Sequence, residues 1–427
     1  MIDFIFKRLR GKKILVAGYG REGKSTLRFL QKFLPNAVVG IADKNESATQ
    51  DLDKERFKIY SGDGYLDASS DYDIVIKTPG ISVKDLDIEE SKISSQTDLF
   101  LDAFHNQIIG VTGTKGKSTT SSLIYHLLKE SGKDVVLAGN IGIPILDCIS
   151  NINKRTIIVY ELSAHQLQFI SRSPRVGVLL NIFEEHLDHF GLFEKYKQSK
   201  INILRYMHDG DIAVINNKLC YEADLHEKRY VDFENYNFDD YNIQWDEVPL
   251  RGEHNVLNVK AALCACYSFG LPLDELVPAL YSFKPLEHRQ EFVGVYRGVK
   301  FYNDSISTIP QATIAAVKTI GDINYLLLGG LDRGIDYEPL ISFLKDNVVE
   351  NVLVTGKAGM LIKEMLKNVN YSGNVFDYDD MESAFDILRK MSVPGDLCLL
   401  SPAAASYDRY KNFEERGSVF KELAKKF

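Results

Sequence analysis

The stretch IIGVTGTKGKSTTSSL, from Ile108 to Leu123, decides the fold. It opens as a β-rich run, passes through a glycine-rich turn and continues into the helical pattern STTSSLIYHLLKE. A strand that leads through glycines into a helix presents backbone N–H groups and the positive helix end to an anion. The same order of strand, loop and helix recurs along most of the chain, which predicts an α/β protein with parallel sheets.

The letters Gly-Lys-Ser-Thr occur twice, at 23–26 and at 116–119. The first copy satisfies the full phosphate-loop pattern G-x-x-x-x-G-K-[ST], whereas the second has Val111 where the pattern requires glycine. The surroundings nevertheless favour the second copy as the ATP site. Lys117 stands at the start of the expected helix and can reach the β- and γ-phosphates, and the Ser118 hydroxyl can bind Mg²⁺. The alternative role for Ser118 is a plain helix cap.

The first turn also reads Gly18-x-Gly20-x-x-Gly23, the dinucleotide fingerprint. The next strand ends in Asp43, about 20 residues beyond, where an acid can take a ribose hydroxyl. This context favours a nucleotide or nucleotide-sugar site, with a tight strand-to-helix turn as the alternative. We then expect residues 24–26 to be simple helix-start residues.

Acidic residues follow two further strands. Glu161 ends the strand in TIIVYELSAHQ, and the segment 184–188 follows the strand in VGVLLNIFEEHLDHFG. Ligands of open α/β sheets gather at the carboxyl ends of the strands. Glu161 is therefore a candidate Mg²⁺ ligand, with a solvated loop acid as the alternative.

The bulk composition is that of a globular protein, with 45% hydrophobic and 26% charged residues. A chain of 427 residues is long enough for several domains, and we place them at 1–101, 102–285 and 286–427. Within them, the acidic and aromatic segment 218–250 predicts short antiparallel edge strands or an excursion. The net charge of −8 argues against nucleic-acid binding. The absence of a signal-peptide pattern and of long apolar runs predicts a cytoplasmic protein without membrane contact.

Taken together, these features resemble the Mur ligase family, which uses ATP to join amino acids to a UDP-linked peptidoglycan precursor. The motifs that carry the resemblance follow the family's order: GTKGKST, GNIG (139–142), ELSAHQL (161–167), NIFEEHLDHF (181–190), YKQSK (196–200), GEHNVLN (252–258) and LEHRQEF (286–292). The segments TPGIS (78–82) and SPAAASYDRYKNFEERG (401–417) are most similar to family members that add D-glutamate.

The resemblance implies a Rossmann-like N-terminal domain for the uridine nucleotide and a central P-loop-type ATPase domain with a mixed sheet. A Rossmann-like C-terminal domain would bind the amino acid and close over ATP. The implied substrates are UDP-N-acetylmuramoyl-L-alanine and D-glutamate, joined through an acyl phosphate with release of ADP and phosphate. A monomer with two Mg²⁺ ions is expected.

The resemblance also implies roles for individual residues. The catalytic residues are Lys117, His186 and Lys200, and the metal ligands are Ser118, Glu161, His186 and Lys200, with Lys200 carbamylated. The ATP site comprises Gly113, Thr114, Lys115, Gly116, Lys117, Ser118, Thr119, Asn255, Asn258, Arg289 and Asp304. The UDP-substrate site comprises Gly20, Arg21, Glu22, Asp43, Lys44, Gly80, Asn140 and His186. The D-glutamate site comprises Thr308, Arg333, Ser406 and Phe413.

The chain departs from the family pattern in NDSISTIP, where Ile306 replaces a common lysine and Ile309 a common asparagine. Lys411 is the candidate replacement for the missing cation. Three rival functions stay open: a ligase of the same fold for another amino acid or for folate, an NAD-dependent dehydrogenase that uses the first turn, and a non-catalytic ATP-binding subunit.

Overall fold

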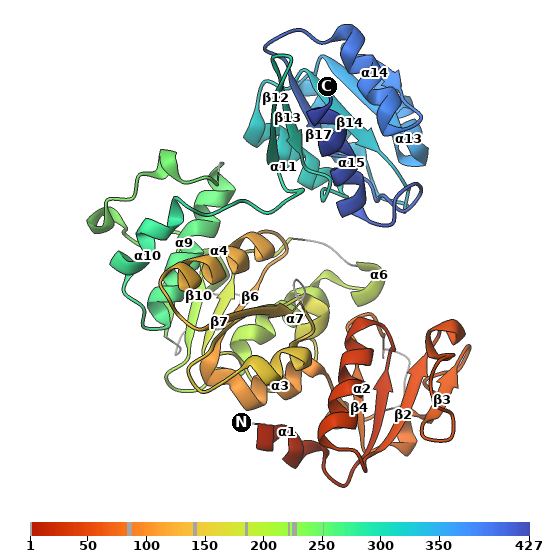
Figure 1. Ribbon diagram of the computed structural model, residues 1–427, viewed down its shortest axis with the longest axis vertical. Coiled ribbons are helices and arrows are strands. Elements are labelled where there is room, and N and C mark those ends of the chain that lie inside the picture. The colour runs from red at the N-terminus through yellow and green to blue at the C-terminus, as the bar shows by residue number, and fades with distance from the viewer. Residues whose placement is uncertain are drawn as a thin grey trace. The chain divides into compact units, whose positions relative to one another are not determined.

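A computed structural model describes residues 2–82, 88–139, 143–183, 187–220, 223, 229–250 and 252–427, and gives no side-chain description for residues 2, 187 and 188. The chain divides into two compact units, Met1–Phe283 and Lys284–Phe427. Figure 1 shows the helices and strands of both units. Among the described residues, no helix has the length and apolar character needed to cross a membrane.

The first sheet of unit 1 follows from the β-rich runs near the N-terminus. Its strands lie in the order β3-β2-β1-β4-β5, and all of their pairings are parallel. The strands are β1 Lys13–Ala17, β2 Val38–Asp43, β3 Lys58–Ser61, β4 Ile74–Lys77 and β5 Ile93–Ser94. Its helices are α1 Ile2–Leu9, α2 Arg21–Phe33 and α3 Gln96–Phe104. The boundary expected at 101/102 falls inside α3, and this division of unit 1 stays a prediction.

The second sheet of unit 1 has the order β11-β10-β9-β6-β8-β7. Its strands are β6 Ile108–Thr112, β7 Val135–Gly139, β8 Ile157–Glu161, β9 Val176–Leu179, β10 Ile212–Ile215 and β11 Tyr230–Asp232. The helices of this region are α4 Lys117–Glu130, α5 Ala164–Leu167, α6 Leu187–Phe190, α7 Phe193–Arg205, α8 Asn217–Cys220, α9 Glu253–Ser268 and α10 Leu273–Leu280.

The expectation that the central sheet is the mixed one is corrected for the described strands. Every pairing described in this sheet is parallel, including that of the edge strand β11 with β10. The connection 216–229 between these two strands is long enough for a crossover, so the chain enters β11 in the same direction as β10. The segment 218–250 therefore supplies an edge strand, but a parallel one.

Apolar residues pack on both faces of the central sheet. On one face, α4, α9 and α10 cover the strands, and their side chains form a single buried cluster with Val111 and Val178. On the other face, a second cluster is continuous with the core of the first sheet, so that Ile41 and Ile203 belong to one cluster. The two sheets of unit 1 are thus held together by burial of apolar surface.

Unit 2 contains the mixed sheet, in the order β12-β13-β17-β14-β15-β16, where only the β12–β13 pair is antiparallel. Its strands are β12 Glu291–Tyr296, β13 Val299–Asn303, β14 Tyr325–Gly329, β15 Asn351–Thr355, β16 Asn374–Asp377 and β17 Leu397–Leu400. Helices α11 Pro310–Ile320, α12 Glu338–Asp346 and α13 Gly356–Asn368 cover one face, and α14 Met381–Met391 and α15 Phe413–Lys425 cover the other.

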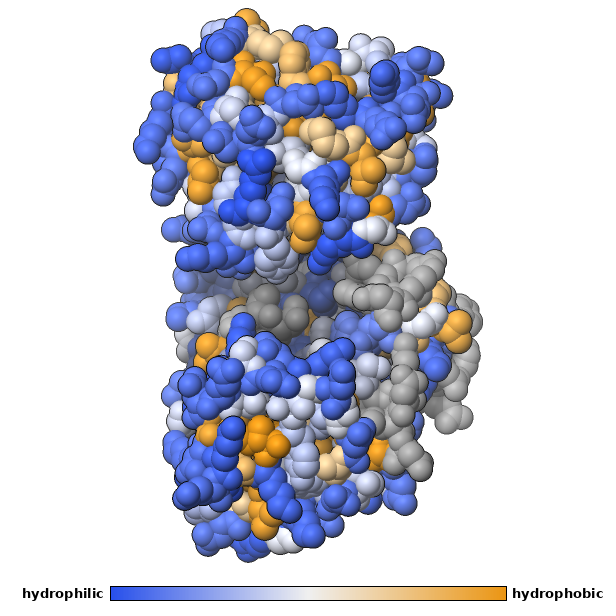
Figure 2. All heavy atoms as spheres, turned by 90° about the vertical axis from the view of Figure 1, so that its right-hand side faces the viewer, coloured by the Kyte–Doolittle hydropathy of each residue, from blue (hydrophilic) through white to orange (hydrophobic). Residues whose placement is uncertain are grey.

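On the face shown in Figure 2, exposed apolar residues are scattered among hydrophilic ones, as is usual for a protein surface.

Candidate functional site

The glycine loop 113–116 joins β6 to α4 at the carboxyl edge of the central sheet. Gly116 caps α4 with a φ of 84°, in the left-handed region. A Cβ at this position would lie 2.3 Å from Oδ1 of Asn258, which projects from α9. Asn258 is 6% exposed, and its Nδ2 donates to Oδ1 of Asn255 at 3.0 Å. The two predicted asparagines therefore brace the loop from α9.

Two lysine side chains converge on the carbonyl oxygen of Gly113. Nζ of Lys117 donates to Gly113 O at 2.8 Å and to Thr114 O at 3.0 Å. Nζ of Lys200, which reaches over from α7, donates to Gly113 O at 2.9 Å. Lys200 is only 2% exposed, and its ammonium lies 4.7 Å from the ring centroid of Tyr196. In a chain of net charge −8, the loop thus carries concentrated positive charge.

The loop is also anchored by residues that the sequence did not single out. Asn181, two residues beyond the end of β9, accepts from Lys115 N at 2.8 Å with its side chain and from Thr114 N at 2.9 Å with its carbonyl. The Thr114 hydroxyl accepts from Phe183 N at 2.9 Å and lies 3.1 Å from the Tyr196 hydroxyl. Both the side chain and the backbone of Thr114 therefore fix the loop, and Asn181 takes the N–H groups of Thr114 and Lys115.

Glu161 lies where a metal ligand is expected. It is fully buried, ends β8, and pairs in register with Val111 of β6, two residues before the glycine loop begins at Gly113. Ser118 is half-buried in the first turn of α4. Buried carboxylates are usually paired or bound to metal, and oxygen donors suit Mg²⁺. The donor set therefore fits an Mg²⁺ ion.

Two predicted residues, Asn140 and His186, lie outside the described residues. Thr119 is buried in the first turn of α4.

Among the described residues, no cluster of three or more histidine, cysteine, aspartate or glutamate side chains is placed to hold a metal. A metal site built partly from serine, a modified lysine or phosphate oxygens would not appear as such a cluster. The predicted ligand His186 is not among the described residues.

The first glycine loop is built differently. Helix α2 begins at Arg21, so Lys24 lies a full turn inside the helix and not at its start. The Lys24 ammonium lies 5.6 Å from the ring centroid of Tyr19. A Cβ on Gly23 would lie 1.9 Å from the carbonyl oxygen of Gly18, and one on Gly18 would lie 2.0 Å from the hydroxyl of Thr78. These two glycines are required by close packing of the turn.

Gly20 caps α2, and a Cβ there would meet nothing within 4 Å, so its backbone is approachable. The Asp43 carboxylate accepts from Tyr19 N at 2.5 Å and from Asn45 N at 2.8 Å. Asp43 therefore ties the first turn to the end of β2. The remaining predicted positions of this site, Arg21, Lys44 and Gly80, are exposed.

Glu22 points toward the central region of unit 1. Its Oε1 accepts from Nε2 of Gln166 at 2.9 Å, and Gln166 also completes the capping box of α5 with Ser163. Burial raises the pKa of Glu22, and the hydrogen bond from Gln166 opposes that rise. Lys77, which ends β4, is 2% exposed, and burial lowers its pKa to about 8 despite the nearby Glu22 carboxylate. This cluster of Glu22 with the buried Lys77 and Gln166 could not be found from the sequence.

In unit 2, Asp304 follows β13 and is 1% exposed. Its carboxylate accepts from the Ser401 hydroxyl at 2.7 Å and from Gln290 N at 3.1 Å. Burial raises the pKa of Asp304 to about 6, while these hydrogen bonds and the Arg289 charge oppose the rise. The predicted pair Arg289 and Asp304 is thus close enough to interact within unit 2.

Three of the predicted D-glutamate residues, Thr308, Arg333 and Ser406, lie in loops at the carboxyl ends of neighbouring strands of unit 2, and Phe413 begins α15. A bridge from Leu331 N to Ala405 O at 2.9 Å holds the loop of Arg333 beside the loop of Ser406. Ser406 is 2% exposed and Arg333 is exposed. The Ser305 hydroxyl donates to the carbonyl of Phe413 at 2.8 Å. The predicted D-glutamate residue Thr308 is half-buried, and Lys411, the candidate replacement for the missing cation, is exposed.

Comparison with known proteins gives consistent results. Residues 111–234 match the Mur ligase middle domain, and residues 288–404 match the Mur ligase glutamate ligase domain. A UDP-N-acetylmuramoylalanine–D-glutamate ligase of Symbiobacterium thermophilum is 34% identical over 90% of this chain and 90% of that protein. The protein of the same name from Clostridium acetobutylicum is 32% identical over 98% of this chain and 97% of its own.

Solved structures share the fold. The MurF ligase of Thermotoga maritima in complex with ADP matches with a TM-score of 0.59 at 20% identity, over 100% of both chains. A MurF structure from Acinetobacter baumannii matches with a TM-score of 0.62 at 13% identity, over 98% of both chains. The predicted fold class is confirmed. The two domain matches cover more than half of the chain, and the relatives are more than 30% identical to it over nearly its full length. The chain therefore belongs to the Mur ligase family.

Proposed function

We propose that the chain is a cytoplasmic ATP-dependent ligase that adds D-glutamate to UDP-N-acetylmuramoyl-L-alanine and releases ADP and phosphate. The observation that carries this proposal is the convergence of Lys117 and Lys200 on Gly113 O in the loop before α4. The names of the relatives support the choice of substrates.

The loop suits phosphoryl transfer because it supplies charge neutralisation and positioning. The N–H groups at the N-terminus of α4 would face the ATP phosphates, and Lys117 would exchange its carbonyl contacts for β- and γ-phosphate oxygens. The γ-phosphoryl group passes to the alanyl carboxylate, which makes a carboxylate oxygen into a leaving group. The D-glutamate amine then attacks the acyl phosphate, and phosphate leaves as the amide forms.

Ser118 and Glu161 would hold one Mg²⁺ ion, and His186 with carbamylated Lys200 a second. Bound Mg²⁺ supplies charge neutralisation for the transferred phosphoryl group. Carbamylation would turn the buried Lys200 amine from a cation into a two-oxygen anion. Because Lys200 already lies 2.9 Å from Gly113 O, a carbamate there would stand beside the phosphate loop.

The remaining predicted residues complete the proposal. Gly20 and the exposed positions around it would bind the uridine diphosphate, mainly through backbone groups, since Glu22 is turned toward Gln166. Arg289 and Asp304 would contribute to the ATP site. D-Glutamate would contact Thr308, Arg333, Ser406 and Phe413, with Lys411 as the candidate cation.

The decisive experiment is phosphate release by the purified chain with ATP, Mg²⁺ and UDP-N-acetylmuramoyl-L-alanine, in the presence of a panel of amino acids. We expect release that depends on D-glutamate and stops when EDTA removes the metal. Activity with another amino acid but not with D-glutamate would contradict the substrate. ATP binding without any phosphate release would favour a non-catalytic subunit, and reduction of NAD would favour a dehydrogenase.

A further inference from the structure

The proposed uridine-diphosphate site contains an acid close to where the diphosphate would bind. Helix α2 begins at Arg21, so Glu22 is its second residue. The N-terminus of a helix attracts anions, and a carboxylate of the first turn is drawn to it as well. A Glu22 side chain directed at this helix end would compete with a diphosphate and repel it. Binding of the substrate here therefore requires that the carboxylate is held elsewhere.

Gln166 holds the Glu22 carboxylate on the side of the central region. Its Nε2 donates to Oε1 of Glu22 at 2.9 Å, and Gln166 is only 4% exposed. The oxygen of the same amide accepts from Ser163 N at 3.0 Å and completes the capping box of α5. Because the cap uses the oxygen, the NH₂ group is the part of the amide that faces Glu22, and this group can only donate. Gln166 is therefore oriented to bind a carboxylate.

Lys77 places a positive charge near the same carboxylate. It ends β4, which pairs with β1, the strand that leads into the first turn. Lys77 is 2% exposed, and its ammonium lies 5.5 Å from the ring centroid of Phe169. Burial raises the pKa of Glu22, and the hydrogen bond from Gln166 and the charges of Arg21 and Lys77 oppose the rise. Burial lowers the pKa of Lys77, and the charge of Glu22 opposes that change. The two charges therefore stabilise each other.

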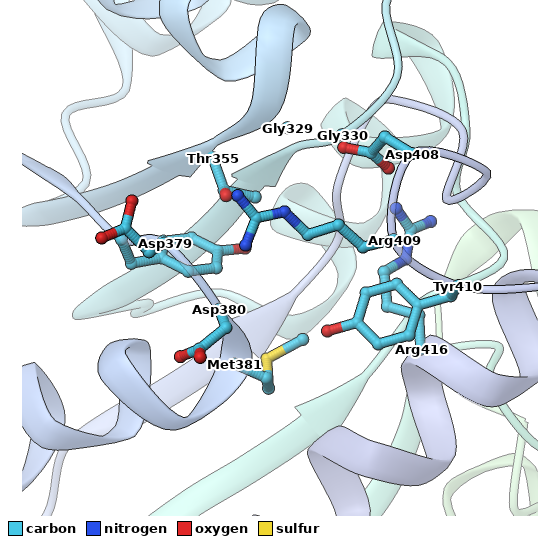
Figure 3. A pocket seen from close by; sticks show the side chains of 11 residues that line it. Gly329, Gly330, Thr355, Asp379, Asp380, Met381, Asp408, Arg409, Tyr410 and Arg416 are labelled. Carbon is cyan, nitrogen blue, oxygen red and sulfur yellow. The ribbon is translucent and has the colours of Figure 1, made fainter.

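Unit 2 shows how a buried cation is held when it braces the fold. Arg416 lines the pocket drawn in Figure 3 and is 4% exposed. It donates to the Ser305 hydroxyl at 3.0 Å, to Ser305 O at 2.8 Å and to Ala404 O at 3.1 Å, so it ties α15 to two loops. The interactions described for the Lys77 side chain are with the Phe169 ring and the Glu22 charge, and neither of them braces a loop. The burial of Lys77 therefore indicates an electrostatic role.

We propose that Gln166 and Lys77 are positioning residues for the UDP substrate, which hold the Glu22 carboxylate away from the N-terminus of α2 and leave that helix end to the diphosphate. Their roles rest on the proposed function and explain how its anion site tolerates an acid. Gln166 supplies the hydrogen bond, and Lys77 supplies the compensating charge from a position too buried to touch the ligand. Without either residue, Glu22 would turn toward the positive helix end and repel the diphosphate.

The test is calorimetric titration of the full chain with UDP-N-acetylmuramoyl-L-alanine in the absence of ATP. Lys77→Met removes the charge, keeps an unbranched side chain, and should weaken binding about tenfold because the Glu22 carboxylate is released. Glu22→Gln should bind the substrate at least as tightly as the wild type. The variant with both changes should bind as the wild type does, because no acid remains to repel the diphosphate.

A second pair of variants exchanges the hydrogen-bonding roles. Gln166→Glu keeps an oxygen for Ser163 N, and so keeps the capping box, but it faces Glu22 with another carboxylate. Binding should weaken about tenfold or more. When Glu22→Gln is added, the amide introduced at position 22 can donate to the carboxylate introduced at position 166, and the affinity should return.

Lys13→Met is the matched control for Lys77→Met. It removes an exposed lysine at the amino end of β1, away from the carboxyl edge of the same sheet, and should leave the affinity unchanged. Only variants with a cooperative urea unfolding curve are titrated, so a loss of affinity is not a loss of fold.

A loss in Lys77→Met or Gln166→Glu that persists when Glu22→Gln is added would overturn the proposal, because it would mean direct contact with the substrate. Loss in Glu22→Gln alone, unchanged affinity in Lys77→Met, or an equal loss in Lys13→Met would overturn it as well. In all these cases the wild type binds the UDP substrate, and the proposed function stands. A wild type that does not bind this substrate would overturn both.

Discussion

The two Gly-Lys-Ser-Thr copies of this chain have the same letters but stand at different phases of their helices. Helix α4 begins at Lys117, so that lysine folds back over the loop and donates to Gly113 O at 2.8 Å. Helix α2 begins at Arg21, so Lys24 lies a turn inside it, exposed and over the Tyr19 ring. The comparison shows that, of the two copies, the lysine folds over its loop where the helix begins at that lysine, and not where the full pattern of letters is present.

The glycines of the two loops are also required for different structural reasons. Gly23 is needed because a side chain there would collide with the carbonyl of Gly18. At this point the backbone of one residue packs directly against the backbone of the other. Gly116 is needed because it caps α4 at positive φ against Asn258. The first loop therefore uses its glycines to close a tight turn, and the second uses its glycine to begin α4 at positive φ beside Asn258.

The largest effect is expected from Lys200, which belongs to the second loop through its contact with Gly113 O. Lys200→Ala should reduce D-glutamate-dependent phosphate release by about a thousandfold, because a charged group beside the transferred phosphoryl is lost. Short carboxylates added to this variant should restore part of the activity by replacing the carbamate. Release is measured at saturating substrates.

The matched control is Lys197→Ala, in the same helix, where the ammonium pairs with Glu194 at 3.3 Å. It should retain turnover close to that of the wild type. Equal loss in both variants would mean that α7 has been disrupted, and full activity of Lys200→Ala would remove Lys200 from the mechanism.

A smaller effect, on stability, is expected at the first loop. Gly23→Ala should lower the free energy of unfolding by about 3 kcal/mol, because the new Cβ would have to displace backbone. Glycine-to-alanine changes inside helices usually stabilise by about 0.5–1 kcal/mol, so the sign itself is diagnostic. Gly20→Ala, where the Cβ meets open space, should change stability by less than about 1 kcal/mol in the same urea titration. A stable Gly23→Ala variant would show that this turn is not closely packed.

The smallest effect concerns the charge beside the first loop. Burial lowers the pKa of Lys77 to about 8 from 10.5, so between these values the unfolded chain holds a proton that the folded chain has released. The free energy of unfolding of the wild type should therefore rise with pH in this window, and below it the dependence should vanish. Relative to Lys77→Met, the gain should be on the order of 1 kcal/mol between about pH 7.5 and 9.5. Parallel stability curves would show that Lys77 titrates normally.

Much of this could be predicted from the sequence. Alternation of β-rich runs and helical patterns predicted the α/β class, and Glu161 was placed at a strand end by its position after TIIVY. The start of α2 could not be predicted, because Gly20, Arg21 and Lys24 are all compatible with the first residues of a helix. The choice depends on how Gly23 packs against Gly18, which is a contact and not a local preference.

Other features could not be predicted because they depend on contacts between residues that are distant in the sequence. The anchoring of the second loop by Asn181 and Tyr196 arises where β9 and α7 meet β6. The burial of Lys77 arises from packing of the first sheet against the central region, near Phe169. The position of the mixed sheet was mistaken because composition does not specify the direction in which the chain enters β11, which pairs parallel to β10.

The measurement that tests the comparison most directly is the affinity for ATP with Mg²⁺ of two variants, Lys24→Ala and Lys117→Ala, titrated by calorimetry beside the wild type. If the second loop holds ATP, Lys117→Ala should bind about tenfold or more weakly, and Lys24→Ala should stay within about twofold of the wild type. Loss of affinity in Lys24→Ala with retention in Lys117→Ala would contradict the account and return ATP to the first loop.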